Sequence, residues 1–129
     1  MKKFLKNDSG TAMVEFALIS TILVLLLVGI VQLGLVFNAQ LTLDYVAREG
    51  VRMAALPSTL TDNEIKTNMI GQLPQTINLQ ASQISITPSV RRRAQPVTVI
   101  INYNFPVFVT MGVLPESYSL SARVVMMKE

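Results

Sequence analysis

The chain has 129 residues, the size of one domain; half of them are apolar, only 15% are charged, and the formal net charge is +3. Because it contains no cysteine and no histidine, thiol chemistry and disulfides are excluded, and zinc sites, catalytic triads and imidazole proton shuttles lose their usual residues. The acidic residues are scattered and form no paired-carboxylate motif, so we predict a protein that is not an enzyme, with no cofactor, metal site or small-molecule substrate.

The first long element expected along the chain is an uncharged apolar helix at 16–37. Sixteen of its 22 residues are Leu, Ile, Val or Phe. About 20 apolar helical residues cross a bilayer, and insertion of this segment is favoured by roughly 5–10 kcal/mol. A buried core helix is the alternative, but such a helix is normally shorter and carries a polar stripe. We therefore predict a single transmembrane span.

Charges before this span predict its orientation. Lys2, Lys3 and Lys6 precede it, and the positive-inside rule then keeps the N-terminus in the cytoplasm and the residues after about Asn38 outside. A secretory signal would have a shorter apolar core followed by a small-x-small cleavage site. The sequence around Asn38 is a poor site of that kind, so the span is expected to stay attached as an anchor.

The helix is expected to continue beyond the membrane, because no proline or turn cluster interrupts 11–56. Two pairs of opposite charge have helical spacing on its outer part: Asp44 with Arg48 at i, i+4, and Glu49 with Arg52 at i, i+3. Such spacing predicts weak surface ion pairs. Apolar residues also stand on this part, with charges between them, at Leu41, Tyr45, Val51 and Ala55.

The remaining segment, 57–129, is expected to form an α+β domain outside the membrane. Thr61 and Glu64 have capping-box spacing and start a short amphipathic helix that ends near Pro74. The apolar side of this helix consists of Ile65, Met69, Ile70 and Leu73.

Three later segments alternate apolar and polar residues with a period of two, at 82–87, 97–105 and 118–126. This period predicts half-buried antiparallel strands. We expect a three-stranded antiparallel sheet packed over the outer half of the long helix, together with the short helix.

Two stretches of this domain allow more than one interpretation. The basic run Arg91, Arg92 and Arg93 is outside the cytoplasm and has no aromatic neighbours, so a solvated hairpin loop is favoured over a nucleic-acid contact, and no nucleic-acid partner is predicted. The apolar segment 106–115 is either a loop that covers the core or a patch used by a partner, and the core interpretation is favoured.

The junction before the span contains Gly10, Glu15 and Phe16. A carboxylate at a helix start, where the helix dipole favours negative charge, is one explanation of Glu15. A glycine followed five positions later by a glutamate and then an aromatic is also the cleavage signature of class III prepilin-like proteins. Together with the span and the AREGVR segment at 47–52, this junction resembles the N-terminal region of TadE-like pseudopilins of the tight-adherence (Flp) type IVb pilus systems.

The resemblance implies that 1–10 is a leader, cut by an aspartic prepilin peptidase between Gly10 and Thr11. The mature chain would carry eight basic and seven acidic residues. Its new α-amine at Thr11 would pair with Glu15, either of a neighbouring subunit or of the same chain one helical turn away. Glu15 and Phe16 would serve in recognition and assembly.

The resemblance further implies a pilin-like fold, with domains at 1–10, 11–56 and 57–129, and a structural role. The protein is expected to be a minor pseudopilin that assembles or initiates an adhesion pilus, relevant to biofilm formation.

Its implied partners are a companion pseudopilin, the major pilin, the assembly platform and the prepilin peptidase. Its implied location is the bacterial inner membrane, with the pilus as a second location. Partner contacts are assigned to Arg48, Glu49 and Arg52. The alternative is an uncleaved, signal-anchored subunit of another envelope assembly.

Overall fold

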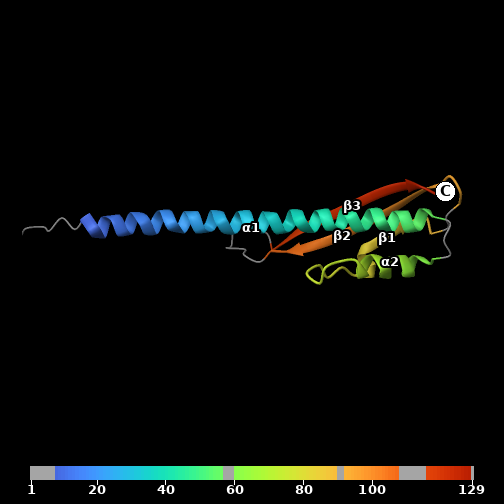
Figure 1. Cartoon of the computed structure of the whole chain (residues 1–129), viewed down its shortest axis with the longest axis horizontal. Helices are drawn as coiled ribbons and strands as arrows, with labels where there is room; N and C mark the ends of the chain where they lie inside the picture. Colours follow the sequence, from blue (N-terminus) through green and yellow to red (C-terminus); the bar gives the residue numbers. More distant parts are fainter. Residues whose placement is uncertain (1–7, 57–59, 90–91, 108–115, 129) are drawn as a thin grey trace, which may run out of the picture. The chain divides into compact units, whose positions relative to one another are not determined.

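A computed structural model describes residues 8–56, 60–89, 92–107 and 116–128. The chain divides into two compact units, an N-terminal unit (Met1–Gly34) and a C-terminal unit (Leu35–Glu129). Figure 1 shows the elements, and their order along the chain is α1 (Asp8–Ala55), α2 (Asp62–Gly71), a 3-10 turn η1 (Ala81–Gln83), β1 (Ile84–Thr87), β2 (Pro96–Pro106) and β3 (Ser117–Met127). This arrangement confirms the predicted α+β class, with a long helix, a short helix and a three-stranded antiparallel sheet.

Helix α1 begins three residues before the predicted start and ends at Ala55. In the N-terminal unit its apolar side chains are exposed almost without interruption from Met13 onward. The two hydroxyl side chains within this stretch find partners inside the helix. Ser20 Oγ and Thr21 Oγ1 both donate to the carbonyl oxygen of Ala17, at 3.0 and 2.8 Å. Since a helix also bonds its own backbone groups, this stretch meets the main requirement for a membrane span.

The sheet of the C-terminal unit has the strand order β1-β2-β3, so it is a simple antiparallel meander with β2 in the middle. Strand β2 pairs with β3 along its whole length, from Pro96 opposite Met127 to Pro106 opposite Ser117. It pairs with the much shorter β1 only from Thr98 to Ile101. The first predicted strand is therefore shorter than expected, because its first two residues belong to η1.

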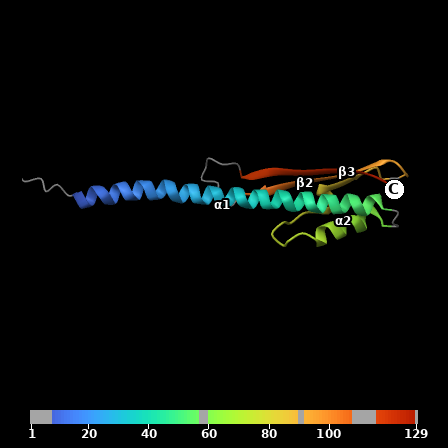
Figure 2. The same ribbon diagram turned by 45° about the horizontal axis from the view of Figure 1, so that its top comes forward.

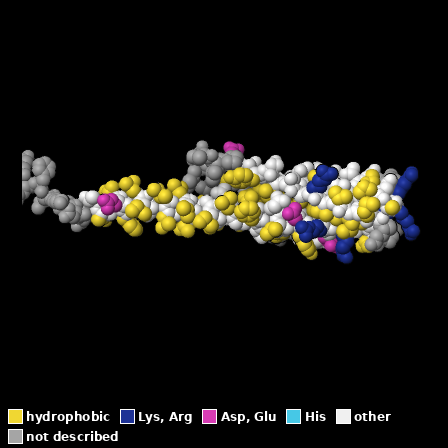
Figure 3. All heavy atoms as spheres, turned by 90° about the horizontal axis from the view of Figure 1, so that it is seen from above, with side chains coloured by type: hydrophobic (Ala, Val, Ile, Leu, Met, Phe, Trp, Pro, Cys, Tyr) yellow, Lys and Arg dark blue, Asp and Glu magenta, His cyan; other side chains and the backbone are white. Residues whose placement is uncertain are grey.

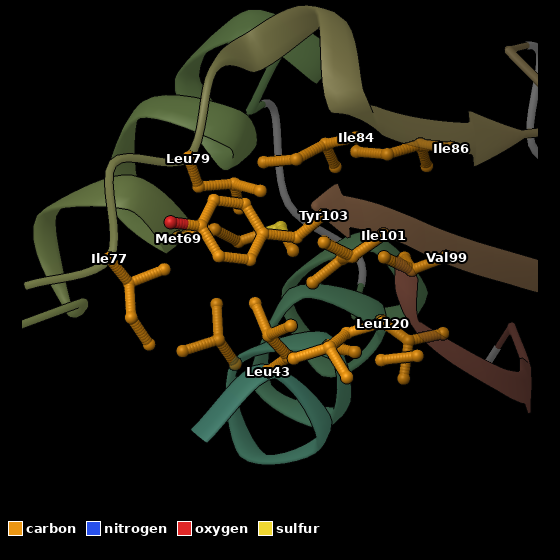
Figure 4. Close-up of a cluster of buried hydrophobic side chains, with 14 of the residues drawn as sticks. Leu43, Met69, Ile77, Leu79, Ile84, Ile86, Val99, Ile101, Tyr103 and Leu120 are labelled. Atoms are coloured by element: carbon orange, nitrogen blue, oxygen red, sulfur yellow. The ribbon is translucent and has the colours of Figure 1, made fainter. Parts of the chain in front are cut away.

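One face of the sheet is buried against the two helices. Figure 2 shows the three strands on one side of α1 in this unit, and Figure 4 shows side chains from both helices and all three strands meeting in one cluster. The alternation predicted for the strands is present, since every second residue of β2 from Val97 to Phe105 is buried. The largest fully buried side chains of the core are Leu43, Val46, Val51, Ile65, Met69, Ile84, Val97, Val99 and Ile101.

Helix α2 confirms the prediction made from its capping box. Thr61 is its N-cap: the Thr61 hydroxyl accepts a hydrogen bond from the backbone N–H of Glu64, and the Glu64 carboxylate accepts one from the backbone N–H of Thr61 at 2.7 Å. The backbone hydrogen bond from Thr61 lowers the pKa of the Glu64 carboxyl below its ordinary value. On the opposite side of the helix, Ile65 and Met69 are fully buried.

The apolar residues on the outer part of α1 do not all face the core. Val51 and Ala55 are buried, but Leu41 and Tyr45 are 69% and 64% exposed. The core is instead reached by Leu43 and its neighbours on the same face. The sequence could not distinguish the two, because Leu41 and Leu43 are equally apolar and only the position of the sheet decides which of them is covered.

The two ambiguous stretches have different outcomes. Arg92 and Arg93 lie in the connection between β1 and β2 and are exposed, as expected for a solvated loop. The backbone N–H of Arg92 donates to Oε1 of Gln95 at 3.2 Å, which closes this turn. Arg91 and most of the apolar segment 106–115 lie outside the described residues, so both interpretations of that segment stay open.

Candidate assembly interface

The predicted processing junction lies in the first turns of α1. Gly10 is partly covered, whereas Thr11, Glu15 and Phe16 are exposed, and Phe16 retains 73% of its accessible surface. Thr11 and Glu15 are four residues apart in a continuous helix, so they share one helix face. The helical spacing permits the pairing within one chain that the sequence suggested, and it leaves Glu15 equally open to a neighbouring subunit.

The apolar surface after this junction is the largest exposed hydrophobic feature of the described chain. Figure 3 shows hydrophobic side chains along the visible face of the N-terminal unit. Helix α1 is long and apolar enough to cross a membrane, and none of its most apolar window is buried within the protein. A core helix of a soluble protein would be mostly buried, and this helix is not. A surface of this kind needs lipid or other apolar helices around it.

One polar side chain interrupts this surface near its end. Gln32 retains only 7% of its accessible surface, and its Nε2 has no hydrogen-bond partner among the described residues. Nothing in the sequence singles out Gln32, because one glutamine subtracts little from the apolarity of a 22-residue span.

The AREGVR segment divides its residues between the core and the surface. Ala47 and Val51 are fully buried in the C-terminal unit. Arg48 and Arg52 are exposed, and Glu49 is partly covered. The segment therefore combines two tasks along one helix: its small apolar residues hold α1 in the core, and its charged residues face outward.

Only one of the two predicted ion pairs is present. Arg52 and Glu49 form a two-pronged contact, with Nε to Oε2 at 3.1 Å and Nη2 to Oε1 at 3.0 Å. The hydrogen bond to the Glu49 carboxylate, together with its charge, raises the pKa of the already basic Arg52 guanidinium. This pair also places a positive charge in the last turn of α1, where the helix dipole favours it.

The predicted pair between Asp44 and Arg48 is wrong. The Asp44 carboxylate instead accepts a hydrogen bond from Nε2 of Gln40 at 3.3 Å, and the same nitrogen donates to the backbone oxygen of Ser121 in β3 at 3.1 Å. Gln40, which is bonded to β3, is therefore the partner of Asp44 in place of Arg48. Among the described residues Arg48 makes no ion pair, and its guanidinium is available to a partner.

Sequence reasoning missed the part played by Gly50 in the packing of α2 on α1. A Cβ at this position would collide with Sδ of Met69 in α2 and lie 2.7 Å from its Cε. The absence of a side chain at Gly50 therefore lets α2 pack closely on α1. An isolated glycine in an amphipathic helix is the one available signal for such a close approach.

Among the described residues, no three Asp, Glu, His or Cys side chains gather where a metal ion could bind. The two sets of predicted site residues also belong to different units, with the junction residues in the N-terminal unit and the AREGVR residues in the C-terminal unit.

Comparison with known proteins gives a match that covers both the junction and the AREGVR segment. Residues 10–52 match the model of a family described as TadE-like protein. This segment is TadE-like. The match begins at Gly10, ends at Arg52 and confirms the resemblance drawn from the junction and the AREGVR segment. The match covers about a third of the chain and links this segment, not the whole protein, to the TadE-like family. No curated protein and no solved structure gives a significant match.

Proposed function

We propose that this protein is a minor pseudopilin of a tight-adherence (Flp-type) pilus, cut by prepilin peptidase between Gly10 and Thr11. Helix α1 anchors it in the bacterial inner membrane, with the leader in the cytoplasm and the C-terminal unit outside. There it takes part in pilus assembly or initiation, together with a companion pseudopilin, the major pilin and the assembly platform.

One observation carries the proposal: the cleavage signature of Gly10, Glu15 and Phe16 stands at the start of a TadE-like helix whose apolar side chains are exposed. Cleavage would leave a positively charged α-amine at Thr11, one helical turn before the Glu15 carboxylate. A lone carboxylate near the hydrocarbon costs up to about 3 kcal/mol on insertion scales, so pairing it with the α-amine of the same or a neighbouring subunit favours assembled helices.

The outward charges of the AREGVR segment support a second part of the proposal, contact with a partner pseudopilin. Arg48 is exposed and makes no ion pair among the described residues, whereas Arg52 and Glu49 already hold each other. We assign the main partner contact to Arg48. Glu49 and Arg52 form a fixed charged pair beside it.

The test is the intact mass of the protein purified from its native host, with and without the gene for prepilin peptidase. The expected result is a mature chain that begins at Thr11 only when the peptidase is present. In the same host, Gly10→Leu is expected to keep the leader. Gly29→Ala is the matched control because nothing lies within 4 Å of a Cβ at Gly29, and this variant is expected to be processed normally.

A full-length chain beginning at Met1 in both strains would overturn the proposal and favour an uncleaved, signal-anchored subunit of another envelope assembly. The partner contact is tested separately, by co-purification of the companion pseudopilin with Arg48→Glu and with Arg92→Glu. Arg92 is an equally exposed arginine of the β1–β2 loop, so only Arg48→Glu is expected to lose the companion.

A further inference from the structure

Strand β3 forms one edge of the sheet, and its outer side has backbone groups without a strand partner. The backbone oxygen of Glu116 accepts from Val107, and the backbone N–H of Lys128 donates to Gln95, so even-numbered residues at both ends of β3 bond toward β2. In an antiparallel pair this orientation alternates along the strand. The backbone groups of the odd-numbered residues, from Ser119 to Met127, therefore point away from the sheet.

Part of this edge is already covered by α1. Gln40 Nε2 donates to the backbone oxygen of Ser121, which both confirms the outward direction of this group and occupies it. Beyond Ser121, no described residue forms a hydrogen bond with the outward groups of Arg123, Val125 or Met127. The last three odd-numbered positions are thus an open edge, defined here by these three residues.

A groove of about 450 Å³ lies beside the open edge. Its lining residues come from the last turn of α1 and the end of β3: Arg52, Ala55, Leu56, Met126 and Met127. Most of this lining is apolar and unusually exposed for apolar residues, with Met127 at 59%. A strand edge next to an apolar groove is the combination that proteins use to bind an extended segment, since the edge supplies main-chain hydrogen bonds and the groove takes alternate side chains.

The charge around the open edge selects the kind of segment. Arg123 is exposed on β3, and Lys128 reaches α1, where its Nζ donates to the backbone oxygen of Leu56 at 3.5 Å. Arg52 also lines the groove, but Glu49 balances its charge. Strand β3 contains no Asp or Glu. A second copy of β3 would bring a second Arg123 toward these basic residues, which is unfavourable when like charges face each other across strands.

We propose that the open edge of β3 binds an extended segment of a partner protein, in which apolar residues alternate with Asp or Glu. The segment adds a fourth strand to the sheet, places its apolar side chains on the side of the groove and its carboxylates on the opposite face, beside Arg123. This inference needs only the C-terminal unit, so it stands or falls independently of cleavage at Gly10.

The test uses the full chain in non-ionic detergent micelles and an eight-residue peptide of alternating Val and Glu, blocked at both ends. A peptide of alternating Val and Lys is the control. Residue-resolved amide exchange is expected to slow by about tenfold or more at Arg123, Val125 and Met127 when the acidic peptide is added, because only their N–H groups face the added strand. The amides of Val124 and Met126 are expected to stay unchanged.

Two variants and one matched control test the geometry and the charge. Val125→Pro removes one outward N–H without removing a bond to β2, and is expected to weaken peptide binding about tenfold or more. Ser119→Pro makes the same change on the same edge outside the groove and is expected to leave binding unaltered. Arg123→Glu is expected to weaken the acidic peptide about fivefold and to improve binding of the basic one.

Three results would overturn the proposal. The first is equal binding of the acidic and basic peptides. The second is acidic-peptide binding that Arg123→Glu leaves unchanged, which remains decisive if Val125→Pro disturbs the exchange of the Val124 and Met126 amides and so damages the fold. The third is slowing of the odd-numbered amides with protein concentration alone, which would make a second copy of the chain the occupant.

Discussion

Gly50→Ala is the substitution that best tests how α2 is held on α1. A methyl group at this position would collide with Sδ of Met69 and lie 2.7 and 3.1 Å from its Cε and Cγ. Met69 is fully buried, so its side chain has no open space into which it can turn. Either Met69 leaves its favoured rotamer, or α2 moves away from α1.

The expected cost follows from two opposing effects. Overpacking a core by one methyl group typically destabilises a protein by about 1–3 kcal/mol. Alanine is the better helix former and stabilises a helix interior by about 0.5–1 kcal/mol relative to glycine. The overpacking effect is larger, because the collision involves three atoms of one buried side chain. We expect Gly50→Ala to lower the free energy of unfolding of the C-terminal unit by about 1–2 kcal/mol.

Hydrogen exchange of the β2 amides, in the full chain in detergent micelles, measures this loss as a fivefold to thirtyfold increase in exchange rate. Gly71→Ala is the control, since a Cβ there meets nothing within 4 Å, and we expect a change of no more than about 0.5 kcal/mol. In the double variant Gly50→Ala with Met69→Ala, the new methyl group fills space vacated by the methionine. Its loss of stability is expected to be smaller than the sum of the two single losses by about 1 kcal/mol or more. A Gly50→Ala chain as stable as the wild type would refute the reasoning, because helix propensity would then outweigh packing.

Three further predictions concern the same unit. Leu43→Ala removes a fully buried side chain from the α1–sheet contact and is expected to cost about 2–5 kcal/mol, read from the shift in urea midpoint at unchanged slope. Gln40→Ala removes the side-chain bond to the backbone oxygen of Ser121; stability, read from the urea midpoint, is expected to fall by about 0.5–1.5 kcal/mol, and an unchanged midpoint would contradict that role. The lowered pKa of Glu64 means that its carboxylate stabilises the start of α2 at neutral pH and that this contribution is lost as pH falls through the lowered pKa. Exchange of the first α2 amides, corrected for intrinsic rates, is therefore expected to speed up in acid in the wild type but to show no such step in Glu64→Gln.

The capping box and the strand alternation show which features can be predicted from residues close together in the sequence. Thr61 and Glu64 are three residues apart and bond to each other, so the start of α2 needs no contact from elsewhere. Alternation in β2 identified the buried face of the strand because the side-chain period of a strand is fixed by its backbone. The apolar run at 16–37 predicted an exposed helix for a similar reason, since its length and lack of charge are properties of the segment itself.

The sequence by itself therefore determined the features whose causes lie within a few residues: the candidate span, the helix cap, the strand periodicity, and the junction and AREGVR residues that mark the TadE-like segment. Only the tertiary structure decided which of Leu41 and Leu43 is buried, that Asp44 bonds to Gln40, and that Gly50 makes room for Met69. Those outcomes depend on surfaces brought together from distant parts of the chain. Several pairings of equally apolar or equally charged residues satisfy the local pattern, and the packing of α1 against α2 and the sheet selects one of them.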